Sequence, residues 1–339
     1  MSSPQPVVRP GPRRRALVLV LGAVALVAAC SSPGHPDASS ASAPPETTVP
    51  AAEGALASSG CTTASDDPAV TGPTPDDPAR TGRRTITSGG VERSYLLTRP
   101  TGAVPGVPSP VILTFHGFGS TAEEFSSLTQ LPERGAAAGF TIVVPEGAGH
   151  TWQFTGDGTD AAFVDAVLDD VAATTCVDRH RVTASGFSAG AAFTIAYACA
   201  HPDRVSAIVT VAVDFQLGCK RPLPILAFHG TADPAVPYTD GAMGLSLPGT
   251  KVRGTENNLG DWAALDRCDR SATVETVGPE VVRHIWTGCA DGTEVGLYAV
   301  QGGGHSWPGA DPTRSVGLTT QEISATDLAL AFAARHRGV

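Results

Sequence analysis

The chain has 339 residues, a net charge of −10 and seven cysteines. Its negative charge argues against nucleic acid and against anionic lipid as binding partners. The sequence carries neither a Gly-rich phosphate loop nor the paired-cysteine and histidine spacings of metal sites. We therefore expect no nucleic-acid partner, no cofactor and no metal.

The first 29 residues have the pattern of an export signal. Four arginines between positions 9 and 15 precede an uncharged apolar run at 16–27. A membrane-spanning helix needs roughly 20 apolar residues, so this run of about a dozen is typical of a signal peptide. The run ends in VAAC at 27–30, which resembles a bacterial lipobox and predicts a lipid on Cys30. An ordinary signal peptide is the alternative, and Sec or twin-arginine export stays open.

Residues 30–82 are rich in Ala, Ser, Pro and Thr and almost lack large apolar side chains. Such a segment cannot bury enough surface to offset its ordering entropy, so we expect a flexible tether. Cys61 lies within it and could tie its later part to the folded body. Residues 83–339 have the length of a single catalytic domain.

Apolar runs alternate with helical patterns along this domain, after a hairpin predicted at 85–97. Continuous rather than alternating apolarity is typical of parallel strands that are buried on both faces. Strands are expected at 111–115, 141–144, 181–187, 207–213, 225–228 and 294–300, and helices at 122–138, 160–174, 189–200 and 319–336. The order predicts an α/β fold with a mostly parallel sheet covered by helices on both faces. The irregular segment 238–258 either lines the site or merely connects two elements.

The strongest motif is GFSAG at 186–190, which follows a predicted strand and begins a predicted helix. That context is typical of a nucleophile elbow, in which a tight turn lifts the serine hydroxyl above the sheet. We therefore assign Ser188 as the candidate nucleophile. A serine hydroxyl needs a base, and His305 stands in a glycine-rich loop directly after the last predicted strand.

The acid that orients His305 should lie between serine and histidine in the chain. Asp233 follows the strand at 225–228 and is our candidate, with Asp214 as the main rival one strand earlier. His229, in the same turn as Asp233, is interpreted as structural. HGFG at 116–119 follows the strand at 111–115, so the backbone N–H groups of Phe118 and Ala189 are the expected oxyanion donors. A plain glycine-rich turn is the alternative for 116–119.

Six cysteines remain once Cys30 is set aside for lipid, and six permit 15 pairings. We prefer Cys268 with Cys289, which would close a short loop outside the main sheet. The pairing of the other four stays open. These are Cys61, Cys176, Cys199 and Cys219.

Taken in order, HGFG at 116–119, GFSAG at 186–190, HGTAD at 229–233 and GGGHSWPG at 302–309 resemble the poly(3-hydroxybutyrate) depolymerase-like esterases. That family includes feruloyl and acetylxylan esterases and lipoproteins of actinobacteria. The resemblance implies an α/β-hydrolase fold and a triad at Ser188, Asp233 and His305. It also implies an acidic position at Asp160 and loop-holding roles for Trp307 and Pro308.

These observations predict a serine carboxylic-ester hydrolase that acts on short hydroxyalkanoate, feruloyl or acetyl esters of small molecules or polymers. A binding lipoprotein on a retired hydrolase fold and a serine peptidase are the alternatives. We expect a monomer that the lipid on Cys30 anchors to the outer face of the cell membrane. The acyl group, and whether solid polymer is attacked, stay open.

Overall fold

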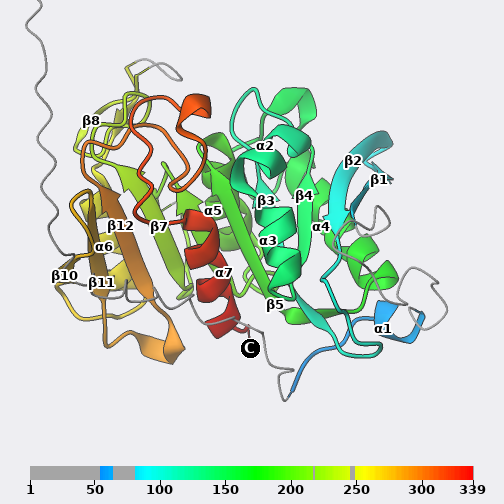
Figure 1. The fold of residues 1–339 in the computed structure, drawn as a ribbon. Coiled ribbons are helices and arrows are strands. Elements are labelled where there is room, and N and C mark those ends of the chain that lie inside the picture. Colours follow the sequence, from blue (N-terminus) through cyan, green and yellow to red (C-terminus); the bar gives the residue numbers. More distant parts are fainter. Residues whose placement is uncertain (1–53, 64–80, 217, 245–248, 339) are drawn as a thin grey trace, which may run out of the picture. The chain divides into compact units, whose positions relative to one another are not determined.

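A computed structural model describes residues 54–63, 81–216, 218–244 and 249–338 (Figure 1). All of them lie in one unit, Glu46–Val339. The expected signal peptide and Cys30 lie outside the described residues. Within the described ranges, no helix is long and apolar enough to cross a membrane.

Ten strands form the main sheet, in the order β1-β2-β4-β3-β5-β6-β7-β12-β11-β10. Its central strands from β4 to β12 are parallel, and antiparallel strands complete both edges. The strands are β1 Thr81–Ser88, β2 Val91–Thr98, β3 Ser109–Phe115, β4 Thr141–Pro145, β5 Val177–Phe187, β6 Ala207–Val211, β7 Ile225–Gly230, β10 Thr273–Thr276, β11 Val281–Trp286 and β12 Val295–Val300. A separate small hairpin joins β8 Gly241–Ala242 and β9 Lys251–Val252.

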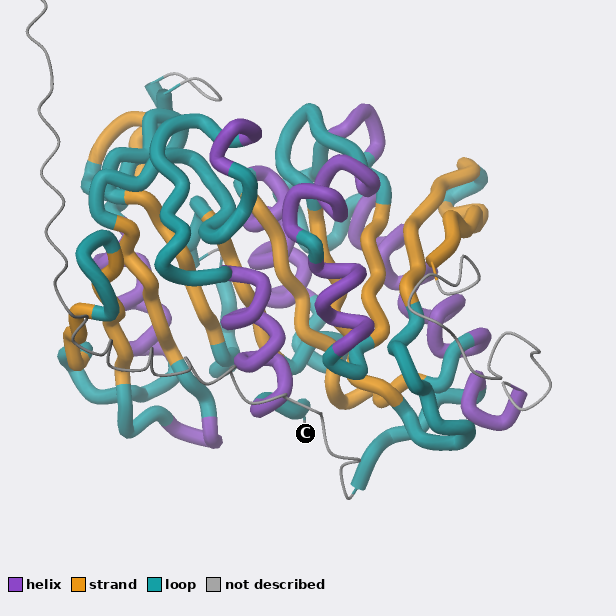
Figure 2. The backbone as a smooth tube through the Cα atoms, in the orientation of Figure 1, coloured by secondary structure: helices purple, strands orange, loops and turns teal. Residues whose placement is uncertain are grey.

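Helices cover both faces of the sheet (Figures 1 and 2). They are α1 Gly60–Thr63, α2 Ala122–Thr129, α3 Leu131–Ala137, α4 Thr159–Thr174, α5 Ala189–Ala200, α6 Thr255–Leu265 and α7 Ala325–Arg335, with short 3-10 turns at Ala148–His150, Ala290–Gly292 and Pro312–Arg314. Side chains of α4, α5 and α6 enter one core layer, and those of α2, α3 and α7 enter the other. The two layers confirm the predicted α/β architecture.

The alternation of side chains along β3 divides its residues between the two layers. Val111, Leu113 and Phe115 pack into the layer under α4 and α5, whereas Ile112 packs into the opposite layer. Every residue of β3 is buried, as expected of a central parallel strand.

The helix predicted at 122–138 is wrong as a single element, because the structure divides it into α2 and α3. Gln130 adopts a left-handed conformation with φ of 54° and ends α2. Pro132 then occupies the first turn of α3, the helical position where its missing N–H costs nothing. A continuous helix would have required that N–H as a donor.

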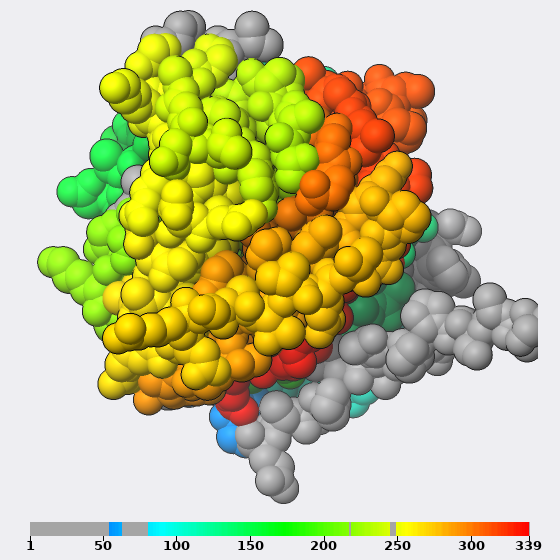
Figure 3. Space-filling view, turned by 90° about the vertical axis from the view of Figure 1, so that its left-hand side faces the viewer, coloured from blue at the N-terminus to red at the C-terminus, as the bar shows by residue number. Residues whose placement is uncertain are grey.

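One further prediction differs from the structure at the C-terminal side. The last helix begins at Ala325 rather than at 319, because Ser324 caps it through the N–H of Asp327. The strand predicted at 294–300 is β12, the last along the chain, but β11 and β10, which the sequence analysis does not predict, pair beyond it in the sheet. The segment that contains α6, β10 and β11, yellow to light orange in Figure 3, covers this edge.

Three disulfides link the described cysteines: Cys61–Cys176, Cys199–Cys219 and Cys268–Cys289. The preferred pair, Cys268–Cys289, is therefore present. Residues 54–63, expected to be tether, instead lie against the start of β5, where Ser58 exchanges hydrogen bonds with Val177. A bridge that closes 115 residues, such as Cys61–Cys176, stabilises a fold by about 4 to 5 kcal/mol in the chain-entropy model.

Candidate active site

Ser188 lies in the turn between β5 and α5 in a conformation that non-glycine residues rarely adopt. Its φ is 55° and its ψ is −118°. The turn is held by the Ser188 N–H, which donates to the Val211 carbonyl of β6 at 2.9 Å. Strained backbone of this kind is concentrated at functional sites, where surrounding contacts fix it.

The glycines on either side of Ser188 permit two close backbone approaches. A Cβ atom on Gly186 would lie 2.4 Å from the Gly190 carbonyl oxygen. A Cβ atom on Gly190 would lie 2.1 Å from the Phe115 carbonyl oxygen. Neither position has room for a side chain, so the elbow packs directly against the end of β3.

His305 and Asp233 meet after adjacent strands of the sheet, β12 and β7. His305 Nδ1 lies 2.7 Å from Asp233 Oδ2, which is the geometry of a charge-assisted hydrogen bond. The Asp233 side chain is 0% exposed and that of His305 is 12% exposed. The imidazole is therefore oriented by a buried carboxylate while part of the ring stays accessible.

Ring and backbone contacts bring the His305 loop to the elbow. The rings of His305 and Phe187, the neighbour of Ser188, lie 4.8 Å apart between centroids. A Cβ atom on Gly230 would lie 2.3 Å from the Gly303 carbonyl oxygen, so the two loops need glycine to approach. Ser188, Asp233 and His305 thus follow the carboxyl ends of β5, β7 and β12, which lie at one edge of the sheet.

Asp233 is held as a carboxylate. Its Oδ1 accepts from the N–H groups of Ala235 and Val236 at 2.8 and 2.9 Å. Burial by itself would raise the pKa of Asp233, but hydrogen bonds from His305 and Val236 and the charges of His305 and His229 outweigh it and lower that pKa. An ionised acid is what a neutral imidazole needs to act as a base.

A second histidine–aspartate pair lies behind the first. His229 Nδ1 lies 2.8 Å from Asp214 Oδ2, and both side chains are almost completely buried. Asp214 is the rival acid expected from the sequence, and His229 is the residue interpreted there as structural. In the structure, Asp214 contacts His229 and Asp233 contacts His305. The Asp214–His229 contact could not be predicted from the sequence, because the two residues follow or end different strands.

Phe118 and Ala189 are the expected oxyanion donors. Phe118 lies in the loop after β3, and Ala189 follows Ser188 in the elbow, which packs against the end of β3 at Gly190. In the described part of the chain, neither N–H donates to a carbonyl or a side-chain acceptor. The Phe118 side chain is 75% exposed on the loop after β3. Both N–H groups are therefore available to a ligand.

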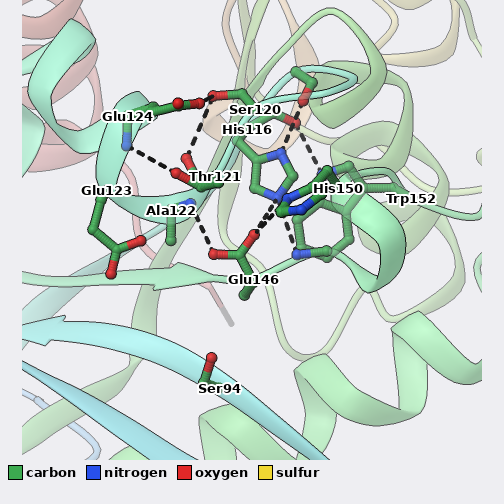
Figure 4. A network of polar contacts seen from close by, with 12 residues as sticks. Ser94, His116, Ser120, Thr121, Ala122, Glu123, Glu124, Glu146, His150 and Trp152 are labelled. Carbon is green, nitrogen blue, oxygen red and sulfur yellow. Dashed lines mark hydrogen bonds and ion pairs between the residues drawn. The ribbon is translucent and has the colours of Figure 1, made fainter.

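A polar network centred on Glu146 holds the loop that carries Phe118 (Figure 4). Glu146 Oε2 accepts from the Ala122 N–H at 3.0 Å, and its other oxygen lies between His116 and His150. His116 Nε2 accepts from the Gly147 N–H, and the Trp152 indole donates to the His116 carbonyl. Burial is the main cause of the lowered pKa of His116. The ring is therefore neutral, and it supports the loop through hydrogen bonds.

Two residues singled out by resemblance lie outside the reacting centre. Asp160 accepts from Arg93 at 2.6 Å and from the Gln153 N–H, so it fixes the start of α4. Trp307 is buried and donates to Thr326 Oγ1 at 3.0 Å, which attaches the histidine loop to α7. Both contacts hold loops in place.

A hollow of about 1030 Å³ lies away from these residues, at the amino ends of the strands. Its walls include Arg179, Ser206 and Pro224, at or just before the starts of β5, β6 and β7. Its arginines are largely matched by carboxylates, as in Arg335 with Glu294, so its charges do not point to a ligand. The chemistry of the opposite edge, with a strained serine and a buried acid, is the stronger indication of an active site.

Sequence comparisons relate the chain to esterases. Residues 110–239 match the family model described as the alpha/beta hydrolase fold. NocK of Nocardia uniformis subsp. tsuyamanensis, which carries the name of an esterase, is 29% identical over 75% of this chain and 83% of its own length. Feruloyl esterase D of Neurospora crassa is 27% identical over 78% and 87%, respectively. Feruloyl esterase B of Piromyces equi is 27% identical over 63% of this chain, which spans only 42% of that relative.

Solved structures share the fold. A feruloyl esterase module of Clostridium thermocellum complexed with sinapinate aligns with a TM-score of 0.51 at 15% identity, over 79% of this chain and 91% of the module. The acetyl xylan esterase of Aspergillus awamori aligns with a TM-score of 0.50 at 13% identity, over 66% and 94%. At these identities the likeness concerns the fold alone.

Proposed function

We propose that the chain is an esterase of the α/β-hydrolase fold that acts through Ser188 as nucleophile, His305 as base and Asp233 as acid. The observation that carries this proposal is the convergence of the three residues. A serine with φ of 55°, a partly exposed imidazole and a buried carboxylate 2.7 Å from that imidazole follow three strands at one sheet edge. Acyl transfer to serine uses an imidazole base that a buried acid orients in this way.

In this mechanism the Ser188 oxygen attacks the ester carbonyl carbon while His305 Nε2 takes the hydroxyl proton. The N–H groups of Phe118 and Ala189 stabilise the negative charge that develops on the carbonyl oxygen. His305 then returns the proton to the leaving alcohol, and an acyl group stays on Ser188. Water then attacks the acyl carbon while His305 takes a proton from it, and His305 gives that proton to the Ser188 oxygen as the carboxylic acid leaves.

The substrates we propose are feruloyl, acetyl or short hydroxyalkanoate esters. Exposed apolar side chains near the site support acyl recognition: the side chain of Phe118, whose N–H is one of the proposed oxyanion donors, is 75% exposed. Val316 is 54% exposed, and its carbonyl accepts from the His305 N–H. An aromatic and an aliphatic contact of this kind suit an acyl chain better than a charged one.

The purified chain should hydrolyse p-nitrophenyl acetate, p-nitrophenyl butyrate and methyl ferulate, and a fluorophosphonate probe should label it at Ser188. The ratio of kcat/KM values among the esters ranks the acyl groups. A matched peptide p-nitroanilide serves as the control for peptidase activity. Absence of ester hydrolysis together with absence of labelling would instead support a binding protein on a hydrolase fold.

We also propose that the protein is exported as a monomer and anchored through lipid on Cys30 at the outer face of the membrane. Three disulfides among the described cysteines support an oxidising compartment. Cells fed radiolabelled palmitate should label the protein, and Cys30→Ser should remove the label. Equal labelling of both forms would contradict the anchor.

A further inference from the structure

The buried surroundings of His229 determine where its protons lie. His229 Nε2 is 3.0 Å from the Val236 carbonyl oxygen, which can only accept, so Nε2 carries a hydrogen. His229 Nδ1 is 2.8 Å from Asp214 Oδ2, and the His229 side chain is 1% exposed. A contact at that distance requires a proton between the two atoms, and the ring holds it because a carboxyl is the stronger acid of the two. A ring with hydrogens on both nitrogens is an imidazolium.

Asp214 is arranged to remain the negative partner of that cation. Its other oxygen, Oδ1, accepts from the Asn258 amide at 2.7 Å, and its side chain is 2% exposed. Thr255 of α6 places its hydroxyl 2.8 Å from the same His229 nitrogen. A buried charge is tolerated when it is paired and its remaining lone pairs are satisfied, as they are here.

We infer that Asp214 and His229 form a buried ion pair that positions the acid Asp233 and keeps it ionised. His229 Nε2 lies 3.7 Å from Asp233 Oδ2, the oxygen that also binds His305. The same nitrogen of His229 donates its hydrogen to the Val236 carbonyl. In that turn, the N–H groups of Ala235 and Val236 donate to Asp233 Oδ1. A row of alternating charge thus runs from Asp214 through His229 to Asp233, whose Oδ2 also binds His305. The inference rests on the function proposed above.

The titratable groups that face His229 agree with a charged ring. Asp214 follows β6 and Asp233 follows β7, whereas the third ionisable neighbour, Tyr238, meets the His229 ring edge-on at 5.7 Å. Burial would lower the pKa of His229, but the hydrogen bond and charge of Asp214, the Val236 carbonyl and the charge of Asp233 together raise it. The pKa of Tyr238 is also raised, mainly by burial and by Glu256, so the phenol adds no negative charge near neutral pH.

His229→Gln tests the role of the ring, because glutamine can still donate to the Val236 carbonyl but carries no charge. We expect kcat to fall by about 10- to 100-fold with KM nearly unchanged, since His229 acts through the triad and not on substrate. Loss of a positive charge behind Asp233 eases proton uptake by the Asp233–His305 pair. The acid limb of the kcat/KM profile should therefore move up by about half a pH unit or more.

Asp214→Asn should move the acid limb in the same direction, because the His229 ring loses the partner that keeps it charged. Thr255→Val is the matched control: it is buried, touches the same ring nitrogen and removes no charge. Its acid limb should coincide with that of the wild type. The inference would be overturned if the acid limb stayed in place in both His229→Gln and Asp214→Asn. It would also be overturned if the acid limb moved as far in Thr255→Val as in those two variants.

Nitrogen-15 NMR of the wild-type chain gives a readout that does not depend on catalytic activity. At pH 8 both ring nitrogens of His229, assigned by their absence in a His229 variant or by labelling, should carry protons. One unprotonated ring nitrogen would overturn the ion pair. If the protein lacked esterase activity and labelling at Ser188, the proposed function would fail, whereas the NMR result would still decide the charge of His229.

Discussion

Replacing Ser188 with alanine should lower kcat for p-nitrophenyl acetate by about 10⁴- to 10⁶-fold. The alanine has no oxygen to attack the carbonyl carbon, so catalysis falls to what the oxyanion donors and binding retain. The measurement is steady-state hydrolysis at saturating ester, with active sites counted by fluorophosphonate labelling of the wild type. Thermal unfolding should be little changed, because alanine replaces serine without altering the contacts of the elbow backbone.

Ser185→Ala is the matched control for that experiment. Ser185 lies on the same strand, β5, and its buried hydroxyl donates to Thr114 Oγ1 at 2.7 Å, away from the elbow. Its loss should reduce stability by about 1 kcal/mol and leave kcat within a few-fold of the wild type. Retention of more than about one hundredth of kcat in Ser188→Ala would contradict the assignment of the nucleophile.

Asp233→Asn should lower kcat by about 10⁴-fold while leaving the fold intact. The amide oxygen can still accept from the N–H groups of Ala235 and Val236, so the amide NH₂ then faces His305 Nδ1. The imidazole must accept there, and its proton moves to Nε2. A protonated Nε2 cannot take the proton of Ser188, so the variant holds the wrong tautomer.

The pH dependence of stability provides a second readout for this variant. The folded-state pKa of Asp233 lies below its ordinary value, because the interactions with His305, Val236 and His229 outweigh the effect of burial. The ionised group therefore stabilises the wild type at neutral pH, and this contribution is lost as pH falls through the folded-state pKa. The difference in Tm between wild type and Asp233→Asn should shrink in acid.

Asp214→Asn distinguishes the two buried acids. If Asp214 served His305 directly, its loss would cost as much as the loss of Asp233. The contact of Asp214 with His229 predicts a much smaller loss of kcat. Equal losses in the two variants would contradict the assignment of Asp233 as the acid.

Local sequence was sufficient where a short segment imposes its own conformation. Continuous apolar runs predicted the central strands, because a strand buried on both faces has no solvent side. The spacing of Gly186 and Gly190 around Ser188 predicted an elbow, since backbone atoms approach within the radius of a Cβ atom on both sides. These requirements lie within a few neighbouring residues and can be read from the chain.

Tertiary structure alone decided which distant groups meet. Asp214 and Asp233 each follow a strand at the same edge, and only the position of the His229 ring between them shows which one reaches His305. Tertiary structure also determined that Cys61 pairs with Cys176. It likewise determined that β10 and β11 extend the sheet beyond β12. Each depends on distances across the folded chain, which no local pattern records. The sequence by itself thus determined the local chemistry of the elbow, and three-dimensional packing determined the partners of its acid.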